Sequence, residues 1–433
     1  MLEFLFTKTP LIFFTQSLWR DEAFTYFLTK NSIAKILYLS AKDFTPPLHA
    51  LLLKFWIWIF GSSEIAMRSL SLIFYVLTAI VFFLFIEKIF KIKNLWKYIY
   101  FLLFLLNPML LYFSFEARTY SLMALISILS FYLLIQKKYK PYVFVSILGL
   151  YTHYFMLLIL GCQALYIFLV EKKWKPIFKK ILLVLLIFIP WILYSLKQNS
   201  LINEPFWINP VTKDTLKLIP SILYSGYESG FYYLNEIAKN LNVTIFIYLF
   251  IGVFLCYFKK LKNKKIFYLL IIWSFLPVLI TLFVSNFKPL FLPRYLILST
   301  PGLMLLLVYL NKNMGKVFKY VLIAILIIQT FNYMSLQSKN RKKAPYKTVI
   351  THIKKQANPN DLLYVLSELD YHVAKYYYFE DKVFIYNKDY KNIPNFAGKA
   401  LIPQNSIKKT LPSYPEKAYI LHPDLTYDIK TVF

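Results

Sequence analysis

The chain has 433 residues, of which 58% are hydrophobic and 20% aromatic, and its mean hydropathy is +0.53. A soluble domain of this length cannot bury so much apolar surface in one core, so the composition predicts a polytopic membrane protein. The net charge is +29, and the lysines stand in short clusters between apolar runs. That pattern is typical of the cytoplasmic loops of a membrane protein rather than of a groove that binds nucleic acid.

Two kinds of site find no support in the sequence. The two cysteines, Cys162 and Cys256, lie in separate apolar runs, so neither a disulfide framework nor a zinc site is predicted. The chain has nine glycines and no G-x-G-x-x-G, phosphate-loop or D-x-D motif. We therefore expect no nucleotide cofactor and, if the protein is a transferase, no nucleotide-activated donor.

The first segment joins a short apolar run to two adjacent carboxylates. Residues 4–18 are short for a span of about 20 residues and contain Pro10, but they lack the features of a signal peptide, so we expect a membrane segment. Asp21 and Glu22 follow, and such a pair is costly near a membrane unless it has a function. Adjacent helical side chains diverge by about 100°, so we expect Asp21 to react and Glu22 to orient or bind. Alternatively, the pair caps the next helix.

A second segment precedes the clear spans. Residues 22–40 are moderately apolar, and Asp43 then precedes Pro46 and Pro47, a rigid pair that fixes the exit of a loop. An apolar run over residues 51–60 follows and ends at a glycine. Its length suits a helix that lies in the membrane interface better than a full crossing.

Longer apolar runs predict full membrane crossings, over residues 66–90, 98–112, 117–135, 181–196, 241–258, 266–285, 294–310 and 317–335. Residues 141–170 are ambiguous between one long span and two short ones. Lysine clusters flank this region on both sides, and the positive-inside rule assigns both clusters to the cytoplasm, so the region must cross twice. The turn that contains His153 then lies outside, and the total is about eleven spans.

The same rule gathers the polar residues of interest on one face. Lysine clusters over residues 88–97, 259–265 and 312–319 are assigned to the cytoplasm, and the alternation then holds along the whole chain. The extracytoplasmic face receives the long loop over residues 197–240, the C-terminal segment, and Asp21, Glu22, Asp43, Glu116, Arg118, His153 and Arg294.

The character of the sequence changes after residue 335. A basic run over residues 339–343 is followed by helical and strand-like patches, such as residues 361–366 and 382–386. We predict two domains: an all-α membrane bundle over residues 1–335 and a small extracytoplasmic α/β domain over residues 336–433. The absence of a visible internal repeat counts against the transporter folds that are built from inverted repeats.

Each outer-face residue also has a purely structural interpretation. Asp43 is a common turn former before prolines. Arg118 is placed to pair with Glu116 or to extend its charge towards the interface. Arg294 opens a span, where a lone arginine often serves as an anchor. His153 fits either a hydrogen-bonded turn residue or a ligand of a metal or phosphate.

Six short motifs occur in one order along the chain and on one predicted face. They are Leu18-Trp19-Arg20-Asp21-Glu22, Asp43 with Pro46-Pro47-Leu48, Gly61 with Glu64 and Arg68, Glu116-Ala117-Arg118-Thr119-Tyr120, Thr152-His153-Tyr154, and Pro293-Arg294-Tyr295. Together they resemble the glycosyltransferase family 39-like membrane proteins, which are similar to the protein O-mannosyltransferases and the lipid A aminoarabinose transferases and have the GT-C fold. The resemblance runs from the N-terminus to residue 335. The chain departs from it in its short first span and at Thr45, where many relatives carry a histidine, which argues against a metal ligand in that loop.

The resemblance implies transfer, with inversion, of a sugar from a polyprenyl-phosphate carrier to a lipid, glycan or protein acceptor on the outer face. Such chemistry needs a carboxylate that takes the proton of the acceptor hydroxyl and positive charge that holds the departing phosphate. The resemblance casts Asp21 as the base, with Glu22 beside it, and Arg118 and Arg294 as phosphate ligands, because a guanidinium binds two oxygens at once.

The remaining outer-face residues, Asp43, Glu116 and His153, are expected to support this group or to bind a divalent metal, whose requirement the sequence leaves open. Two other function classes also stay open. A lipid or polysaccharide transporter would bind without reacting, but it would place ionisable residues near the bilayer midplane, where the predicted spans carry almost none. A membrane scaffold would leave the outer carboxylates without a function. These features favour the transferase.

Overall fold

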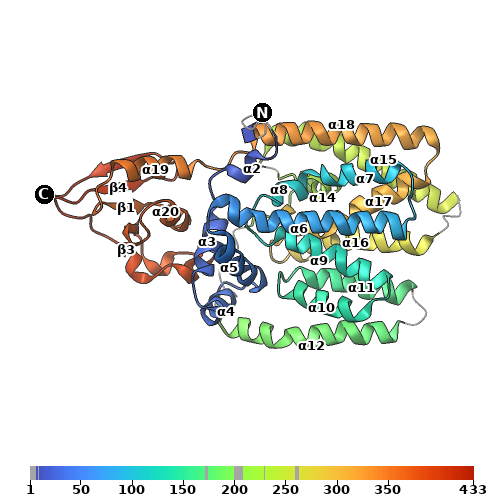
Figure 1. Ribbon diagram of the computed structural model, residues 1–433, viewed down its shortest axis with the longest axis horizontal. Helices are drawn as coiled ribbons and strands as arrows, with labels where there is room; N and C mark the ends of the chain where they lie inside the picture. The colour runs from blue at the N-terminus through green and yellow to red at the C-terminus, as the bar shows by residue number, and fades with distance from the viewer. Residues whose placement is uncertain (1–5, 8, 171–173, 199–207, 229, 259–262) are drawn as a thin grey trace. The chain divides into compact units, whose positions relative to one another are not determined.

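The computed structural model describes residues 6–7, 9–170, 174–198, 208–228, 230–258 and 263–433. The described chain is mostly helical, with one small sheet near the C-terminus (Figure 1), which confirms the predicted fold class. It divides into two compact units. Unit 1 comprises Met1–Phe14, Arg68–Ile192 and Phe206–Arg341, and unit 2 comprises Thr15–Met67, Leu193–Pro205 and Lys342–Phe433. The segment with Asp21 and Glu22 thus belongs to the same unit as the C-terminal segment, and the domain boundary at residue 335 stays a prediction.

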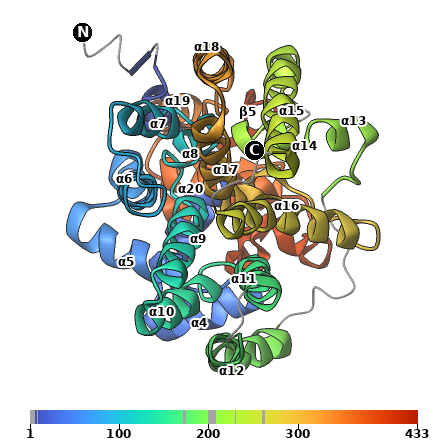
Figure 2. The ribbon, with the colours of Figure 1, turned by 90° about the vertical axis from the view of Figure 1, so that its right-hand side faces the viewer.

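Unit 1 contains the long helices. In Figure 1, α6, α16 and α18 run in roughly the same direction, and Figure 2 shows α18 nearly end-on. The elements from α6 onwards are α6 (Glu64–Leu84), the π-helix η1 (Phe85–Ile89), α7 (Trp96–Leu105), α8 (Pro108–Phe113), α9 (Tyr120–Ile135), α10 (Tyr139–Leu150), α11 (Met156–Val170), α12 (Lys175–Gln198), α13 (Lys213–Lys217), α14 (Ile219–Ser225), η3 (Tyr232–Leu234), α15 (Asn235–Phe258), α16 (Lys264–Ser285), η4 (Pro293–Ser299), α17 (Thr300–Asn313) and α18 (Lys316–Asn340).

Many of these helices are built for a lipid environment. Within the described residues, six are long and apolar enough to span a membrane, and four shorter apolar helices accompany them. The chain is therefore a multi-pass membrane protein, while the number of eleven spans stays a prediction. In the continuous helical segment Pro293–Asn313, 89% of an apolar stretch of 18 residues is buried inside the protein. The corresponding stretch of α12 is 22% buried. The segment that carries Arg294 thus belongs to the centre of unit 1.

The structure refines three of the expected spans. In the described part of the first apolar run, Phe6 and Thr7 are helical, and the helix α2 (Ile12–Thr15) follows Pro10. The span expected over residues 98–112 is broken into α7 and α8 at Asn107, whose side chain accepts the Leu110 N–H at 3.0 Å, just before Pro108. The span expected from Arg294 begins instead as the 3₁₀-helix η4.

The double crossing expected over residues 141–170 appears as two helices. α10 ends at Leu150 and α11 begins at Met156, with the turn that contains His153 between them. Gly149 allows the close packing at this point, because a Cβ there would lie 3.0 Å from Ile126 Cγ2 and 3.1 Å from Met156 Cε. The region thus forms two helices, while its two membrane crossings stay a prediction.

Unit 2 contains the sheet, whose strand order is β3-β2-β1-β4-β5. Four strands are parallel, and β5 pairs antiparallel with β4. The strands β1 and β2 fall within the two strand-like patches of the sequence. The elements are α19 (Tyr346–Gln356), β1 (Leu362–Val365), η5 (Glu368–Asp370), α20 (Tyr371–Tyr377), η6 (Glu380–Lys382), β2 (Val383–Tyr386), η7 (Tyr390–Asn392), η8 (Asn395–Ala397), η9 (Lys399–Leu401), η10 (Gln404–Ser406), β3 (Ile407–Lys408), β4 (Ala418–Leu421) and β5 (Tyr427–Lys430).

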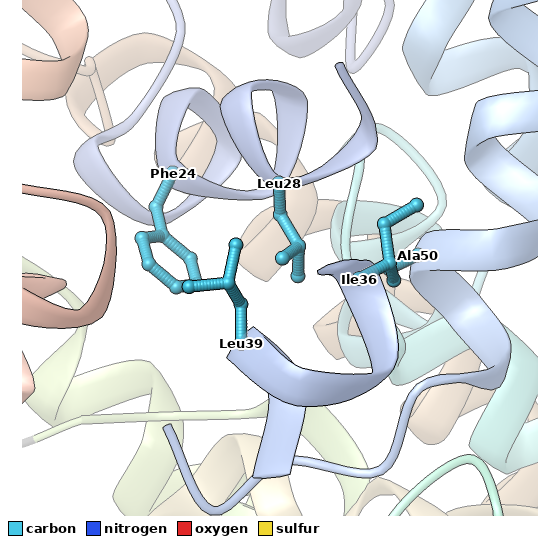
Figure 3. Close-up of a cluster of buried hydrophobic side chains, with 5 residues drawn as sticks. All are labelled: Phe24, Leu28, Ile36, Leu39 and Ala50. Carbon is cyan, nitrogen blue, oxygen red and sulfur yellow. The ribbon is translucent and has the colours of Figure 1, made fainter. Parts of the chain in front are cut away.

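Three N-terminal helices complete unit 2: α3 (Arg20–Thr29), α4 (Ile33–Lys42) and α5 (Leu48–Phe60). α4 has one apolar face, whereas α3 is buried around most of its circumference. The three helices meet in a buried cluster (Figure 3) made of Phe24, Leu28, Ile36, Leu39 and Ala50. Ala400 and Leu401 of η9 pack against this cluster. The helix that carries Asp21 is thereby packed against both its sequence neighbours and the C-terminal segment.

Candidate active site

The two adjacent carboxylates occupy different environments in the first turn of α3. The Trp19 backbone N–H donates to Glu22 Oε2 at 2.8 Å, so Glu22 caps the helix from its third position. The Glu22 side chain is fully buried, whereas Asp21 keeps part of its surface accessible. The capping interpretation therefore describes Glu22, and Asp21 is the more accessible of the two carboxylates.

Glu22 also forms a buried ion pair. Its Oε2 lies 2.8 Å from the Lys343 ammonium, and the two side chains are 0% and 5% exposed. The Lys343 backbone N–H donates to Gln16 Oε1 at 3.0 Å, which ties the same stretch to the segment before α3. Lys343 belongs to the basic run over residues 339–343, and nothing in the sequence pairs that run with Glu22. Glu22 is thus held by both Lys343 and the Trp19 N–H, and its role in the site stays a prediction.

Arg20, on the other side of Asp21, is bound as well. Its Nε donates to Asp370 Oδ1 at 2.8 Å, and its Nη2 lies 2.7 Å from the same oxygen. The Tyr346 hydroxyl donates to this oxygen at 2.6 Å. Burial raises the pKa of the Asp370 carboxyl, and the hydrogen bond from Tyr346 and the charge of Arg20 oppose that rise. No motif in the sequence pointed to Asp370 or Tyr346, because their partner lies more than 300 residues away.

Asp43 occupies a turn. It follows α4, where its backbone N–H donates to Leu39 O at 2.9 Å, and its Oδ2 accepts the Thr45 hydroxyl at 3.4 Å. Phe44 between them has φ of 51°, in the left-handed region that side chains disfavour. This geometry fits the turn-forming interpretation of Asp43 ahead of the two prolines.

In unit 1, three distant segments converge around His153. The ring centroid of Tyr295, next to Arg294, lies 5.0 Å from that of His153, and Phe155 packs on Tyr295 at 5.2 Å. The Thr119 hydroxyl donates to the Thr152 backbone oxygen at 3.3 Å, which ties the residue after Arg118 to the same turn. The structure thus gathers the turns of Arg118, His153 and Arg294 in one place.

The electrostatics of this group favour a neutral His153. Burial and the nearby positive charge of Arg118 lower the pKa of His153 to about 3. Its Nδ1 accepts the Phe155 backbone N–H at 3.1 Å, so the ring proton stands on Nε2. A neutral imidazole adds no further positive charge next to Arg118. His153 is a hydrogen-bonded turn residue, and its Nε2 side is a donor.

Glu116 belongs to a second charged group. The Ser71 hydroxyl donates to the Glu116 backbone oxygen at 2.6 Å, which fixes the turn before Arg118. Arg341, another member of the basic run, places its guanidinium 3.7 Å above the Tyr112 ring and 4.5 Å from the Phe231 ring. Arg341 Nη2 lies 3.9 Å from Glu228 Oε1, and the charge of Glu116 acts on Arg341 more weakly than that of Glu228.

A buried indole holds the segment that carries Arg294. Trp273 Nε1 donates to the Leu298 backbone oxygen at 2.9 Å and lies 3.0 Å from Ser127 Oγ. The Ser127 hydroxyl donates to the same Leu298 oxygen at 2.7 Å. Gly302 makes room for the indole, because a Cβ there would lie 2.7 Å from the Trp273 ring. These contacts anchor η4, which begins one residue before Arg294.

The site residues expected from the sequence fall into two sets. Unit 2 contains Asp21, Glu22 and Asp43, and unit 1 contains Glu116, Arg118, His153 and Arg294. Within the residues that the structure describes, no group of three or more His, Cys, Asp or Glu side chains is arranged to hold a metal ion.

Comparison with solved structures identifies the fold. ArnT from Cupriavidus metallidurans in the apo state matches with a TM-score of 0.60 and 12% identity, over 96% of this chain and 91% of that one. The same protein bound to undecaprenyl phosphate matches with a TM-score of 0.61 and 12% identity, over 96% and 92%. At this identity the likeness shows the fold alone, and it confirms the resemblance to GT-C glycosyltransferases that the motifs indicated.

Comparison with families gives the relationship in sequence. No curated protein matches the chain. The sequence model of the EpsG family matches residues 25–348, so the match begins just after the two carboxylates of α3 and extends into α19. Because that match covers well over half of the chain, the protein belongs to the EpsG family.

Proposed function

We propose that this protein is an integral-membrane glycosyltransferase that transfers a sugar from a polyprenyl-phosphate donor to a lipid, glycan or protein acceptor. The observation that carries the proposal is the likeness, over nearly the whole chain, to a GT-C protein whose structure was solved with undecaprenyl phosphate bound. Membership of the EpsG family and the apolar helices support it. We place the site and the C-terminal segment on the extracytoplasmic side, on the basis of the lysine distribution.

The reaction assigned to this site is a direct displacement at the sugar. Asp21 takes the proton of the acceptor hydroxyl, and the acceptor oxygen forms a bond to the anomeric carbon. The bond from that carbon to the phosphate oxygen breaks, and the polyprenyl phosphate leaves with the electron pair. The configuration at the anomeric carbon is inverted. Asp21 suits the role of base because its carboxylate is accessible and its helix is fixed on both sides.

The departing phosphate requires positive charge, which we assign to Arg118 and Arg294. Both belong to unit 1, where the turns that carry them are gathered around His153. A guanidinium binds two phosphate oxygens in a fixed geometry, which a lysine ammonium does not reproduce. The neutral His153 contributes a donor at Nε2.

The other carboxylates receive supporting roles. Glu22 orients the first turn of α3, Asp43 shapes the turn before α5, and Glu116, whose backbone oxygen accepts from Ser71, holds the turn before Arg118.

The proposal is tested with the purified protein and a short-chain polyprenyl-phosphate sugar. A positioned base contributes about 10² to 10⁴-fold to the rate, so Asp21→Asn should lose turnover by that factor while keeping donor binding and expression. Asp381→Asn removes an exposed carboxylate from η6 and serves as the matched control, with turnover unchanged.

In cells, mass spectrometry of envelope glycans and glycolipids with and without the gene should reveal a missing sugar. An unchanged glycan profile together with donor lipid moved across vesicles would instead identify a transporter. Parental turnover in Asp21→Asn would remove Asp21 from the role of base.

A further inference from the structure

The residues on both sides of Asp21 are bound by the C-terminal segment of the same unit. Arg20 binds Asp370, and Glu22 binds Lys343. Successive side chains on a helix point about 100° apart, so these neighbours leave the helix in different directions. Two fixed directions define the rotation of the first turn about its axis. The direction in which the Cα–Cβ bond of Asp21 leaves the helix is therefore defined as well.

The bond between Arg20 and Asp370 is a charged contact with little freedom. Two guanidinium nitrogens approach one carboxylate oxygen at 2.7 and 2.8 Å, and the Asp370 side chain is 2% exposed. The Tyr346 hydroxyl, from the first residue of α19, donates to the same oxygen at 2.6 Å. Charge-assisted hydrogen bonds of this kind are short and directional. They hold the Arg20 side chain in one orientation.

The ion pair between Glu22 and Lys343 is almost fully buried. Removing two charges from water is costly, and apolar replacements of similar pairs often leave stability unchanged or higher. A contribution to stability therefore does not explain well why this ion pair is present. A role in fixing the geometry of the first turn of α3 explains it better. Because Glu22 Oε2 also accepts the Trp19 N–H, the pair acts directly on the start of the helix.

The chain that leads into α3 is bound by the same segment. The Lys347 backbone N–H donates to Ser17 Oγ at 3.1 Å, and the Leu18 N–H donates to the Tyr377 hydroxyl at 2.8 Å. Further along α3, Phe24 contacts His372 with ring centroids 5.6 Å apart. The entry, the first turn and the body of the helix are thus all in contact with residues after 341.

We propose that Lys343 and Asp370 are positioning residues for the transfer reaction: they fix the first turn of α3 and thereby the direction in which the Asp21 side chain leaves the helix. This inference rests on the function proposed above. Neither residue touches the reacting atoms, and both act through the neighbours of Asp21. Because a misplacement of about 1 Å can cost about 10²-fold in rate, loosening this turn should lower turnover.

The test compares Lys343→Met with Lys343→Arg. Methionine keeps the length of the side chain and removes its charge, whereas arginine restores the charge. We expect Lys343→Met to lower kcat by about 10 to 100-fold with the KM for donor changed less than about twofold, and Lys343→Arg to recover most of the loss. Hydrogen exchange should be faster at the first turn of α3 in the methionine variant and close to the parent in the arginine variant.

Lys355→Met is the matched control. Lys355 lies in the last turn of α19, in the same segment of the chain, and its side chain is exposed. Turnover and exchange in α3 should remain at the parental level. Asp370→Asn provides a second, independent perturbation, with the same rise in exchange and the same fall in kcat, should Lys343→Met fail to fold.

A double variant separates positioning from a general loss of structure. If Lys343 acts only through Asp21, then Asp21→Asn combined with Lys343→Met should have the same turnover as Asp21→Asn alone. Unchanged exchange in α3, or parental kcat despite faster exchange, in both Lys343→Met and Asp370→Asn would overturn the inference. Absence of sugar transfer by the parent protein would instead overturn the proposed function, because the exchange measurement does not depend on activity.

Discussion

Substitution of Trp273 tests whether its indole holds η4, the segment of unit 1 that carries Arg294. The indole is fully buried and stacks on Phe131 with ring centroids 4.1 Å apart. Its Nε1 donates to the Leu298 backbone oxygen of η4. Trp273→Phe removes this donor and part of the ring that fills the space next to Gly302. The η4 segment should then be held less firmly.

The magnitude follows from two contributions. The lost hydrogen bond contributes about 1 kcal/mol rather than a full desolvation penalty, because the Leu298 oxygen keeps the Ser127 hydroxyl as a donor. The space left by the smaller ring adds about 1–2 kcal/mol, below the 3–5 kcal/mol of a complete Trp→Ala truncation. We therefore expect a loss of about 2–3 kcal/mol in the free energy of unfolding. For domains of 150–250 residues this corresponds to a fall in Tm of about 4–12 °C.

Thermal unfolding in detergent or nanodiscs measures this loss, and the binding of a short-chain polyprenyl phosphate measures its consequence. Trp58→Phe is the matched control, since the Trp58 side chain is 78% exposed on α5, and its Tm should stay at the parental value. Donor affinity should fall in Trp273→Phe and remain unchanged in the control. A parental Tm in Trp273→Phe would show that the indole does not anchor η4 and would refute the reasoning.

Two further predictions concern charge. Arg294→Lys keeps the charge and removes the planar fork, so it should weaken binding of a short-chain polyprenyl phosphate without changing the Tm; equal affinity in variant and parent would exclude Arg294 from the phosphate site. For topology, reporters fused after Lys138 and after Lys312 should score as cytoplasmic and a reporter fused after Phe433 as extracytoplasmic, because lysine-rich loops stay on the cytoplasmic side. An extracytoplasmic score after Lys138 would contradict the grouping of the proposed site on one face.

The sequence by itself determined the membrane character, the helical class and the positions of most helices. These follow from local properties, since a run of about 20 apolar residues must form a helix in lipid to satisfy its own backbone. The helices α16 and α18 and the turn at His153 lie where hydropathy and lysine clusters predicted them. The motifs also led to the GT-C fold, which the solved structures confirmed.

Only the tertiary structure decided how the candidate residues are held. Asp21 and Glu22 are neighbours of the same chemical type, yet Lys343, 321 residues away, buries one of them in an ion pair. Arg20 and Asp370 are 350 residues apart, and the contact between His153 and Tyr295 joins two different turns. Such pairs depend on which surfaces meet after the helices pack. The periodicity of a sequence segment indicates which secondary structure that segment forms. It does not indicate which residue of a distant segment will contact it.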